Sequence, residues 1–475
     1  MAEHHYDLVV LGSGAAGEKG AAQAAYFGKR VAMVEKDYYL GGATAGTTVP
    51  SKTLRETAVT LSGVHARQLH GVDISLHGHV SVQDFLHHER VVKQTERQRV
   101  ETNMERHKVD IFKGHGQFKD PHTIEVVAPG KEPEVLKADV VLITTGSRPR
   151  RPDNFPNDPR IYDSDTILQM KRMPKSMCVV GGGVIGCEYA CIFSCLNVDV
   201  SLIHGRDILL DFLDRDISFG LRNCMEKLGV NLLMPKRLES VAAEKDGIRM
   251  TLQGGETILV EAVMLATGRQ SNTDTINLDK AGVELGKYGL IKVNSDYQTN
   301  VEHIYAAGDV IGAPALASTG MEQARFAIMK AMKLPNYKNV VAPILPAGIY
   351  TIPECSSAGM TEEQCKEKKI PYVTGMAKYS QNARGMIIGD YDGFLKLVYN
   401  RDSMKLIGVH VIGEIASELV HLGLAAMTMG ATNELFINTC FNYPTLGEMY
   451  KYATYDAMGK KAKLEKEAAR GDLKE

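Results

Sequence analysis

The feature that most constrains the fold is a strand, glycine turn, helix and strand pattern that occurs twice. The first copy starts with the apolar run 8–11, passes through Gly12-Ser13-Gly14-Ala15-Ala16-Gly17 and ends with the apolar run 31–34. The second copy runs from residues 177–180 through the turn 181–186 to the run 198–203. Short apolar runs of this kind are typical of strands buried on both faces of a sheet. The repeat predicts an α/β fold with two βαβ units.

The glycines of the first turn suit the binding of a dinucleotide. Gly12 permits the tight turn, Gly14 lets the backbone approach a pyrophosphate, and Gly17 lets the helix pack on the sheet. The N–H groups and dipole at the start of the helix attract phosphates. The second copy has the same spacing, so two Rossmann-like dinucleotide sites are predicted, the second one at Gly181, Gly183 and Gly186.

The two copies differ where nucleotide specificity is set. Eighteen residues after the last glycine, the first copy has Glu35 and the second has His204, followed shortly by Arg206. A carboxylate accepts ribose hydroxyls and repels a 2′-phosphate, whereas a nearby arginine accommodates that phosphate. A dinucleotide with a free ribose 2′-hydroxyl is predicted at the first site, and NADP(H), alongside NAD(H), at the second; the family resemblance described below implies that the first is FAD. The alternative for Arg206 is an exposed loop residue without a ligand role.

Composition excludes several classes of partner. The 475 residues suggest about three domains, and 44% hydrophobic with 24% charged residues are typical of a globular protein. A formal net charge of −2 argues against nucleic acid and anionic membranes as partners. No apolar run approaches the roughly 20 residues of a membrane span, and the N-terminus has no leader-like segment. The eight cysteines form no CxxC pair, so a cytoplasmic location is expected.

The stretch 41–55 carries a family resemblance. Its Gly41-Gly42-Ala43-Thr44 and Pro50-Ser51-Lys52 segments resemble the signature of the FAD-dependent pyridine nucleotide–disulfide oxidoreductases. That signature places two cysteines, with four residues between them, before a single residue and Pro-Ser-Lys. Here Ala43 and Thr48 occupy the two positions, and neither can form a disulfide or a thiolate. The resemblance therefore implies the family scaffold without its thiol chemistry.

Further segments extend the resemblance to the rest of the chain. The strand 138–143 with Thr145-Gly146, the strand 263–265 with Thr267-Gly268, and the segment 304–309 ending in Asp309 match family motifs. The resemblance implies that Asp309 binds a ribitol hydroxyl of FAD. The other cofactor-binding positions that it implies are Gly42, Thr44, Lys52, Gly116, Thr145, Gly146, Gly268 and Ala317.

The resemblance also implies the domain order and a homodimer. An FAD-binding domain is expected over 1–155 and 271–342, an NAD(P)-binding domain over 156–270, and an α+β interface domain, through which two subunits pair, over 343–475. The run 349–354 is the expected first strand of the interface domain. The tail 460–475 is expected to be a charged helix or disordered.

Four residues are candidates for catalysis. In the family, a lysine after Pro-Ser lies beside the flavin and pairs with a glutamate, which implies an ion pair between Lys52 and Glu188. The alternative is that these two are unrelated surface charges. Family disulfide reductases carry a general acid–base histidine before Pro-Thr, followed by a glutamate; here Tyr443 and Glu448 occupy these positions.

The three substitutions, Ala43, Thr48 and Tyr443, remove dithiol chemistry as a set. Several stretches look like the soluble pyridine nucleotide transhydrogenases, although that subgroup generally keeps the first cysteine. The predicted reaction moves hydride between NADPH and NAD⁺ through the flavin, without a redox-active disulfide. Two alternatives remain: an NAD(P)H:quinone or dye reductase, and a non-catalytic flavoprotein that senses nicotinamide redox state.

Three cysteines, Cys187, Cys191 and Cys195, recur at helical spacing in the second βαβ unit. A thiol relay or a metal site would be conceivable there. Small apolar residues are what a helix packed on a sheet requires, so we interpret the cysteines as core residues and predict no metal.

Overall fold

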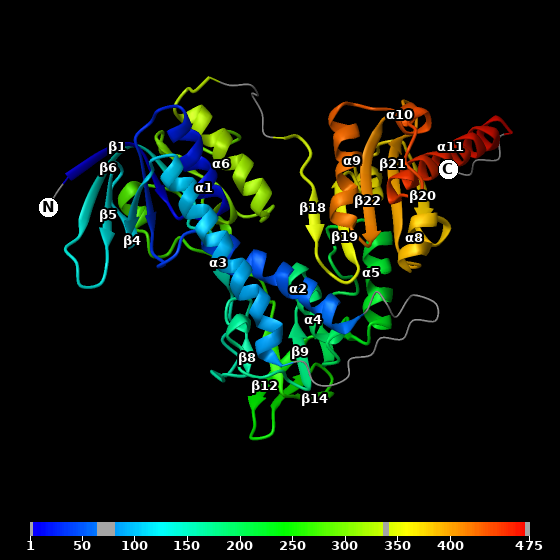
Figure 1. Ribbon diagram of the computed structural model, residues 1–475, viewed down its shortest axis with the longest axis horizontal. Helices are drawn as coiled ribbons and strands as arrows, with labels where there is room; N and C mark the ends of the chain where they lie inside the picture. Colours follow the sequence, from blue (N-terminus) through cyan, green and yellow to red (C-terminus); the bar gives the residue numbers. More distant parts are fainter. Residues whose placement is uncertain (1–2, 64–80, 336–341, 471–475) are drawn as a thin grey trace. The chain divides into compact units, whose positions relative to one another are not determined.

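The computed structural model describes residues 3–63, 81–335 and 342–470 (Figure 1). The chain forms two compact units. The first unit comprises Met1–Thr53, Leu86–Arg150 and Gly268–Ala342, and the second unit comprises Leu54–Phe85, Arg151–Thr267 and Pro343–Glu475. The predicted four-part domain division stays a prediction.

The first unit is built on a seven-stranded sheet. Strands β3, β2, β1 and β6 are parallel neighbours in that order, β17 pairs with the end of β6, and β5 and β4 continue the sheet antiparallel. A separate antiparallel pair is formed by β7 (Ser147–Pro149) and β16 (Arg269–Ser271). The bounds of the sheet strands are β1 Glu3–Leu11, β2 Val31–Glu35, β3 Asp110–Lys113, β4 His115–Asp120, β5 Thr123–Val127, β6 Glu134–Ile143 and β17 Ile304–Ala306.

Strand β1 is buried on both faces, as its apolar run predicts. Leu8 and Val10 belong to one hydrophobic cluster, and Val9 and Leu11 belong to another. Successive side chains of a strand point to opposite faces, so the strand feeds two cores. Three helices contribute to the first of these clusters: α1 (Ala15–Tyr26), α3 (Val82–Arg106) and α6 (Ala317–Ala331). Helices α1 and α6 lie side by side in Figure 1.

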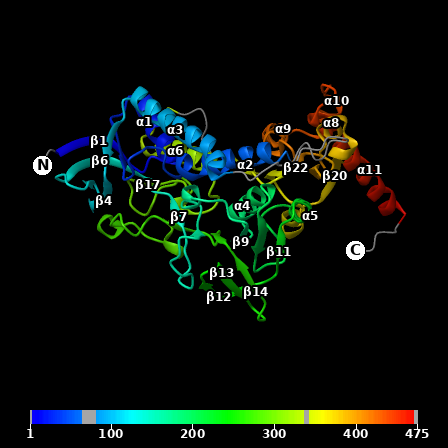
Figure 2. The ribbon, with the colours of Figure 1, turned by 60° about the horizontal axis from the view of Figure 1, so that its bottom comes forward.

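The second unit contains the second βαβ unit. Its parallel sheet has the order β11-β10-β9-β15-β8, and the antiparallel sheet β12-β13-β14 adjoins it (Figure 2). Helix α4 (Val184–Cys195) follows the glycine turn, and its Cys187, Cys191 and Cys195 are fully buried. The bounds are β8 Ile161–Tyr162, β9 Ser176–Val180, β10 Asp199–Ile203, β11 Asn231–Leu233, β12 Leu238–Ala243, β13 Ile248–Leu252, β14 Thr257–Val260 and β15 Ala262–Leu265.

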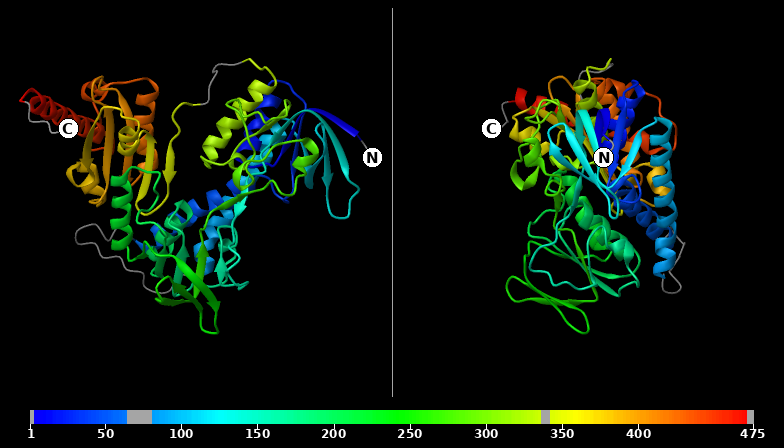
Figure 3. Two further views of the ribbon diagram at one scale, coloured as in Figure 1. Left: turned by 180° about the vertical axis from the view of Figure 1, so that it is seen from behind. Right: turned by 90° about the vertical axis from the view of Figure 1, so that its left-hand side faces the viewer.

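The C-terminal part of the second unit is an antiparallel sheet with helices (Figure 3). The strand order is β18-β19-β22-β21-β20, and helices α9 and α11 pack against it. The bounds are β18 Ala347–Ile349, β19 Glu354–Gly359, β20 Tyr372–Lys378, β21 Phe394–Asn400, β22 Leu406–Gly413, α7 Glu362–Glu367, α8 Ala383–Ile388, α9 Ala416–Thr428, α10 Asn433–Asn438 and α11 Met449–Ala469.

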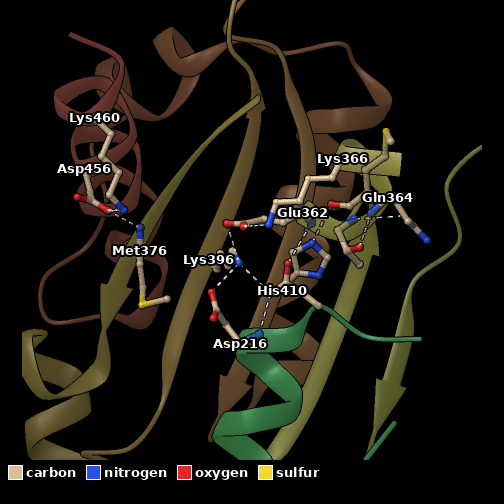
Figure 4. A network of polar contacts seen from close by, with 12 residues as sticks. Asp216, Glu362, Gln364, Lys366, Met376, Lys396, His410, Asp456 and Lys460 are labelled. Atoms are coloured by element: carbon tan, nitrogen blue, oxygen red, sulfur yellow. Dashed lines mark hydrogen bonds and ion pairs between the residues drawn. The ribbon is translucent and has the colours of Figure 1, made fainter. Parts of the chain in front are cut away.

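A buried charge network joins helix α5 (Arg215–Lys227) to this sheet (Figure 4). The Lys396 ammonium, on β21, lies 2.8 Å from Asp214, 2.6 Å from Asp216 and 3.1 Å from Glu362. Asp214 also caps α5, because its carboxylate accepts the backbone N–H of Asp216 at 3.1 Å. The network therefore ties the start of α5 to β21 and α7.

Two sequence-based expectations need correction. The run 349–354 is not one strand, because β18 ends at Ile349 and β19 begins at Glu354. Side chains take the backbone groups in between: Glu188 accepts the N–H of Tyr350, and Arg55 donates to the carbonyl of Thr351, both at 2.9 Å. In addition, the strand expected at 138–143 begins four residues earlier, because β6 spans Glu134–Ile143.

Within the expected tail, α11 is helical to Ala469, and residues 471–475 lie outside the described part. Among the helices that the structure describes, none combines the length and the apolar character needed to cross a bilayer.

Candidate dinucleotide-binding sites

Of the three glycines in the turn of the first unit, only Gly14 has room for a side chain. Gly12 has a φ of +99°, and a Cβ on it would lie 2.6 Å from the carbonyl oxygen of Thr144. A Cβ on Gly17 would lie 1.9 Å from the carbonyl oxygen of Gly12. A Cβ on Gly14, the N-cap of α1, would meet no atom within 4 Å. The fold itself therefore requires Gly12 and Gly17, whereas Gly14 leaves room for a ligand at the helix start, which fits a pyrophosphate.

The second unit repeats this geometry. Gly181 has a φ of +116°, and its Cβ would lie 2.3 Å from the carbonyl oxygen of Ala266. The Cβ of Gly186 would lie 1.8 Å from the carbonyl oxygen of Gly181, and the Cβ of Gly183 would meet nothing within 4 Å. Both turns thus have a backbone-restricted glycine on either side of an open one, and the residues present fit two dinucleotides.

Glu35 ends β2 and is 4% exposed. Its Oε2 accepts the backbone N–H of Ser13 at 2.9 Å and the Ser13 hydroxyl at 2.6 Å, and its Oε1 accepts the N–H of Asp37 at 2.9 Å. A carboxylate has about four acceptor positions, so capacity remains for a ribose hydroxyl. The contacts hold the carboxylate against the glycine turn.

His204 has the equivalent place in the second unit. Its Nδ1 accepts the N–H of Gly182 at 3.2 Å, as Glu35 accepts that of Ser13. Because Nδ1 is the acceptor, the proton of the neutral ring is on Nε2. Burial, and then the nearby Arg206 guanidinium, lower the pKa of His204 below 6.5. A neutral donor therefore replaces the carboxylate of the first site.

Two residues of the segment 42–44 lie next to the open glycine of the first turn. The Oγ1 of Thr44, in the π-helical turn Thr44–Thr48, accepts the N–H of Ala15 at 3.3 Å. A Cβ on Gly42, whose φ is +48°, would lie 3.1 Å from the Cα of Gly14. The predicted Gly42 and Thr44 are thus brought to the start of α1.

The Asp309 carboxylate is held by a chain of hydrogen bonds. Arg269 donates through Nε to the Ser147 hydroxyl at 2.7 Å, and this hydroxyl donates to Asp309 Oδ2 at 2.6 Å. Gly308, with a φ of +81°, donates its N–H to Gln323 on α6 at 2.9 Å. Asp309 is therefore fixed through one oxygen. Neither Ser147 nor Gln323 is predicted from the sequence as a support. Ser147 directly follows Gly146, whose φ is positive, and a polar residue in that position is a usable signal, whereas Gln323 lies within α6 and has no such signal.

The other residues predicted to bind a cofactor have recognisable roles in the local structure. A Cβ on Gly116 would lie 2.9 Å from Val34 Cγ1, so close packing of β4 requires a glycine there. Thr145 donates its hydroxyl to the carbonyl of Asn272 at 2.8 Å. Gly146 and Gly268 have positive φ values of 68° and 111°, and Ala317 is the first residue of α6. Their roles in cofactor binding stay predictions.

The four candidate catalytic residues lie in different settings. Lys52 is on α2 (Val49–Ser62) and donates to the Ser51 hydroxyl at 3.3 Å. Glu188, on α4, is 3% exposed. The predicted ion pair between these two residues stays a prediction. Tyr443 is 74% exposed, and Glu448 accepts a hydrogen bond at 3.3 Å from Tyr452 rather than from Tyr443.

A buried carboxylate lies in the first turn of α1. Glu18 accepts hydrogen bonds from Lys19 at 2.7 Å, from Arg99 at 3.2 Å and from Asn103 at 2.7 Å. Burial alone raises the pKa of Glu18, but the hydrogen bonds from Arg99 and Lys19 bring it below 4.5. Arg99 and Asn103, on the charged helix α3, thus anchor α3 to α1.

The positions of the family disulfide lack sulfur. Ala43 and Thr48 are both exposed, at the two ends of the π-helical turn. All eight cysteines lie in the described part of the chain, none is in a disulfide, and seven are buried, Cys440 being the exposed one. Burial raises the pKa of the Cys191 and Cys224 thiols to about 12. Such thiols are poor nucleophiles at neutral pH.

Comparison with known proteins defines the class. Residues 6–328 match the pyridine nucleotide-disulphide oxidoreductase family, and residues 345–454 match the dimerisation domain of these oxidoreductases. The chain belongs to this family, whose members use FAD and pyridine nucleotides. The resemblance and fold class predicted from the sequence are confirmed.

Two relatives are similar to this chain over nearly its whole length. The chain is 42% identical over 458 residues, 96% of its length and 97% of the relative's, to a protein named soluble pyridine nucleotide transhydrogenase from Mycobacterium tuberculosis (strain ATCC 25177 / H37Ra). A Marinomonas protein (strain MWYL1) of the same name is 41% identical over 466 residues, 97% of this chain and 100% of that protein.

Solved structures share the fold. LpdA from Mycobacterium tuberculosis has a TM-score of 0.87 and 26% identity over 95% of this chain and 99% of its own. The HOCl-induced flavoprotein disulfide reductase RclA from Escherichia coli has a TM-score of 0.85 at 22% identity, over 95% of this chain and 99% of its own.

Proposed function

We propose that this FAD-dependent oxidoreductase transfers hydride between NADPH and NAD⁺ through its flavin, without a redox-active disulfide. The observation that carries the proposal is the duplicated glycine turn with open Gly14 and Gly183, combined with Ala43 and Thr48 at the disulfide positions. Two nucleotide sites suffice for such a reaction, and no thiol is needed. The named relatives support the same activity.

The first site would hold FAD through groups that are already oriented. The N-terminus of α1 faces the open space at Gly14 and would bind the pyrophosphate. Glu35 would accept adenosine ribose hydroxyls. Asp309, fixed through Oδ2 by Ser147, would keep Oδ1 for a ribitol hydroxyl. When bound, FAD would supply the ring that accepts hydride from one nicotinamide and returns it to another.

The second site would bind the nicotinamide nucleotides one after the other. The N-terminus of α4 at Gly183 would bind their pyrophosphate, and His204 and Arg206 would face the adenosine ribose. Lys52 and Glu188, as an ion pair, would stabilise negative charge next to the reacting atoms and orient the nicotinamide. Tyr443 and Glu448 would line the same centre without exchanging protons with a thiol.

The test is direct hydride transfer. The purified, FAD-loaded protein is mixed with NADPH and a thio-analogue of NAD⁺, and reduction of the analogue is followed by absorbance. Fast reduction is expected, together with negligible turnover of disulfide substrates such as lipoamide. A colourless protein that does not retain FAD, or efficient disulfide reduction, contradicts the proposal.

An NAD(P)H:quinone or dye reductase is the second candidate. The observation that favours it is the exposure of the small Ala43 and Thr48 side chains, which leave the disulfide positions open to a diffusible acceptor. Rapid quinone reduction with negligible transfer to the NAD⁺ analogue identifies this activity. A flavin that no nicotinamide reduces identifies the non-catalytic flavoprotein.

The proposal extends to the oligomeric state and the cellular location. We expect a homodimer formed through residues of the dimerisation domain, and a cytoplasmic location, where nicotinamide nucleotides are available. The use of both NADPH and NADH at one site is the part of the proposal that depends on the residues around His204.

A further inference from the structure

The loop that follows β10 folds back over the second glycine turn. Leu210 donates its N–H to the carbonyl of Gly182 at 3.3 Å. A Cβ on Gly182 would lie 2.8 Å from both the Leu209 side chain and the His204 ring, so the loop and the turn are tightly packed. The loop thereby brings Asp211, which follows Leu210, next to Arg206 at the start of the loop. Arg206 and Asp211 form an ion pair.

A second arginine lies beside the same loop. Lys236 donates its N–H to the carbonyl of His204 at 2.9 Å, which brings the residues before β12 next to His204. A Cβ on Gly205 would lie 3.6 Å from Cγ and 3.8 Å from Nε of Arg237. Arg237 makes no ion pair with any residue that the structure describes, whereas Lys236 pairs with Glu256. An exposed guanidinium is thus available at Gly205.

Two arginines, Arg206 and Arg237, therefore lie next to His204, the residue that takes the place of Glu35 at the end of the second strand of the second βαβ unit. Two guanidinium groups would suit a 2′-phosphate, but Asp211 already occupies Arg206. An exposed ion pair of this kind is weak enough for a phosphate dianion to displace the carboxylate.

We infer that Arg237 and Asp211 set the choice between NADP(H) and NAD(H) at the second site. The inference rests on the proposed function and adds two residues to it. With a free 2′-hydroxyl bound, Asp211 stays paired with Arg206, and the Arg237 guanidinium remains in solvent. With a 2′-phosphate bound, Arg206 exchanges Asp211 for the phosphate, and Arg237 adds a second contact. Such an exchange keeps the two affinities close, as a site that binds both nucleotides in turn requires.

The test uses two ligand fragments and needs no turnover. Adenosine 2′,5′-bisphosphate carries the 2′-phosphate of NADP, and ADP is its counterpart without that group. Binding of each is measured by calorimetry on the FAD-loaded protein, so that the first site is filled. We expect Arg237→Gln to weaken binding of the 2′,5′-bisphosphate about tenfold, and Asp211→Asn to strengthen it about three- to fivefold, with ADP changing less than about twofold.

Two control variants separate these effects from net charge. Asp207→Asn removes a negative charge from the same exposed loop, and Arg222→Gln removes a positive charge that pairs with Glu226 on α5. Both are expected to change the ratio of the two affinities by less than about twofold, and salt should weaken the 2′,5′-bisphosphate more than ADP.

Failure of the proposed function and failure of the roles inferred for Arg237 and Asp211 give different results. Wild-type protein that binds neither fragment nor NADPH contradicts the proposed function. The inference alone is overturned by another result: the wild-type protein binds both fragments, but Arg237→Gln and Asp211→Asn change the two affinities equally, or no more than the control variants do.

Discussion

Gly14 and Gly17, three residues apart in the first turn, are glycine for different reasons. Gly17 is fixed by the fold, because any Cβ would overlap the carbonyl of Gly12. Gly14 has free space around it, so packing within the chain does not require a glycine there, and we attribute it to the ligand. The same contrast holds between Gly186 and Gly183. Substituting these residues therefore separates binding from folding.

We expect Gly14→Ala to fold normally and to lose FAD affinity by at least about tenfold, because the new methyl group takes the place of the pyrophosphate. Gly17→Ala should instead destabilise the protein by about 3 kcal/mol or more. Flavin content and thermal unfolding measure the two effects. The matched variant Gly183→Ala should keep FAD and lose nicotinamide binding; a Gly14→Ala protein with full flavin content would contradict the assignment.

Thiol labelling tests the absence of sulfur chemistry. Seven cysteines are buried, and only Cys440 is exposed. We expect a maleimide to modify a single thiol in the native protein and to leave hydride transfer unchanged, since no thiolate is required. Mass spectrometry locates the adduct, and Cys440→Ser is the control, which should take up none. Loss of activity in that variant on labelling would show that a buried thiol takes part.

At the scale of elements, the network around Lys396 shows how a charged group replaces apolar packing. The residue is 2% exposed and binds three carboxylates, two at the start of α5 and one on α7 (Figure 4). These contacts raise its pKa despite burial, so it stays charged. Removing one partner of a buried ion pair leaves the others uncompensated. The ammonium is thus necessary for docking α5 on the sheet.

Lys396→Met is expected to lower the free energy of unfolding by about 3–5 kcal/mol, because Asp214 would remain buried and charged. Chemical denaturation measures the change. The control is Lys366→Met, which removes an exposed lysine 3.6 Å from the same Glu362 and should cost less than about 1 kcal/mol. Equal effects of the two substitutions would show that the network contributes no more than a surface pair.

The neighbouring His410 makes stability depend on pH. Burial lowers its pKa below 6.5, and Nε2 bonds to the carbonyl of Met360 at 2.9 Å. The unfolded chain binds a proton below pH 6.5 that the folded chain does not, so stability is lost as pH falls below 6.5. Wild-type stability should fall up to about 1.4 kcal/mol per pH unit more steeply than that of His410→Gln between pH 6.5 and 5. Parallel pH profiles would contradict this.

At the scale of the whole molecule, apolar side chains gather on the helices of the dimerisation domain. An exposed patch on α10, α11 and the end of α9 comprises Met429, Leu435, Tyr452, Tyr455 and Met458. Helices α10 and α11 lie side by side, since the Asn433 amide contacts the sulfur of Met458 at 3.5 Å. Exposed apolar patches of this kind are typical of subunit interfaces.

A charge in the patch should therefore dissociate the dimer. We expect Tyr455→Glu to shift the protein from dimer to monomer at micromolar concentration, by burying an unpaired carboxylate in the interface. Analytical ultracentrifugation measures the change. The control is Tyr288→Glu, an exposed tyrosine of the first unit, which should leave the dimer intact. A Tyr455→Glu protein that remains dimeric places the interface elsewhere.

The features that can be predicted from the sequence alone are local ones. The glycine spacings, the apolar runs and the substitutions at Ala43 and Thr48 gave the family, the fold class and the two nucleotide turns, because these features depend on residues a few positions apart. The run 349–354 marks the limit of this reasoning. Its propensity for strand is real, but Glu188 and Arg55 take its backbone hydrogen bonds from distant parts of the chain.

Which polar groups contact one another depends on the folded chain. Ser147 and Asp309 are 162 residues apart, Lys396 and Asp214 are 182 apart, and Arg237 reaches Gly205 only because a strand and a loop pack against each other. Such contacts depend on strand register and helix packing, which no short pattern encodes. The sequence thus predicted the two glycine turns, and packing determined which side chains support them.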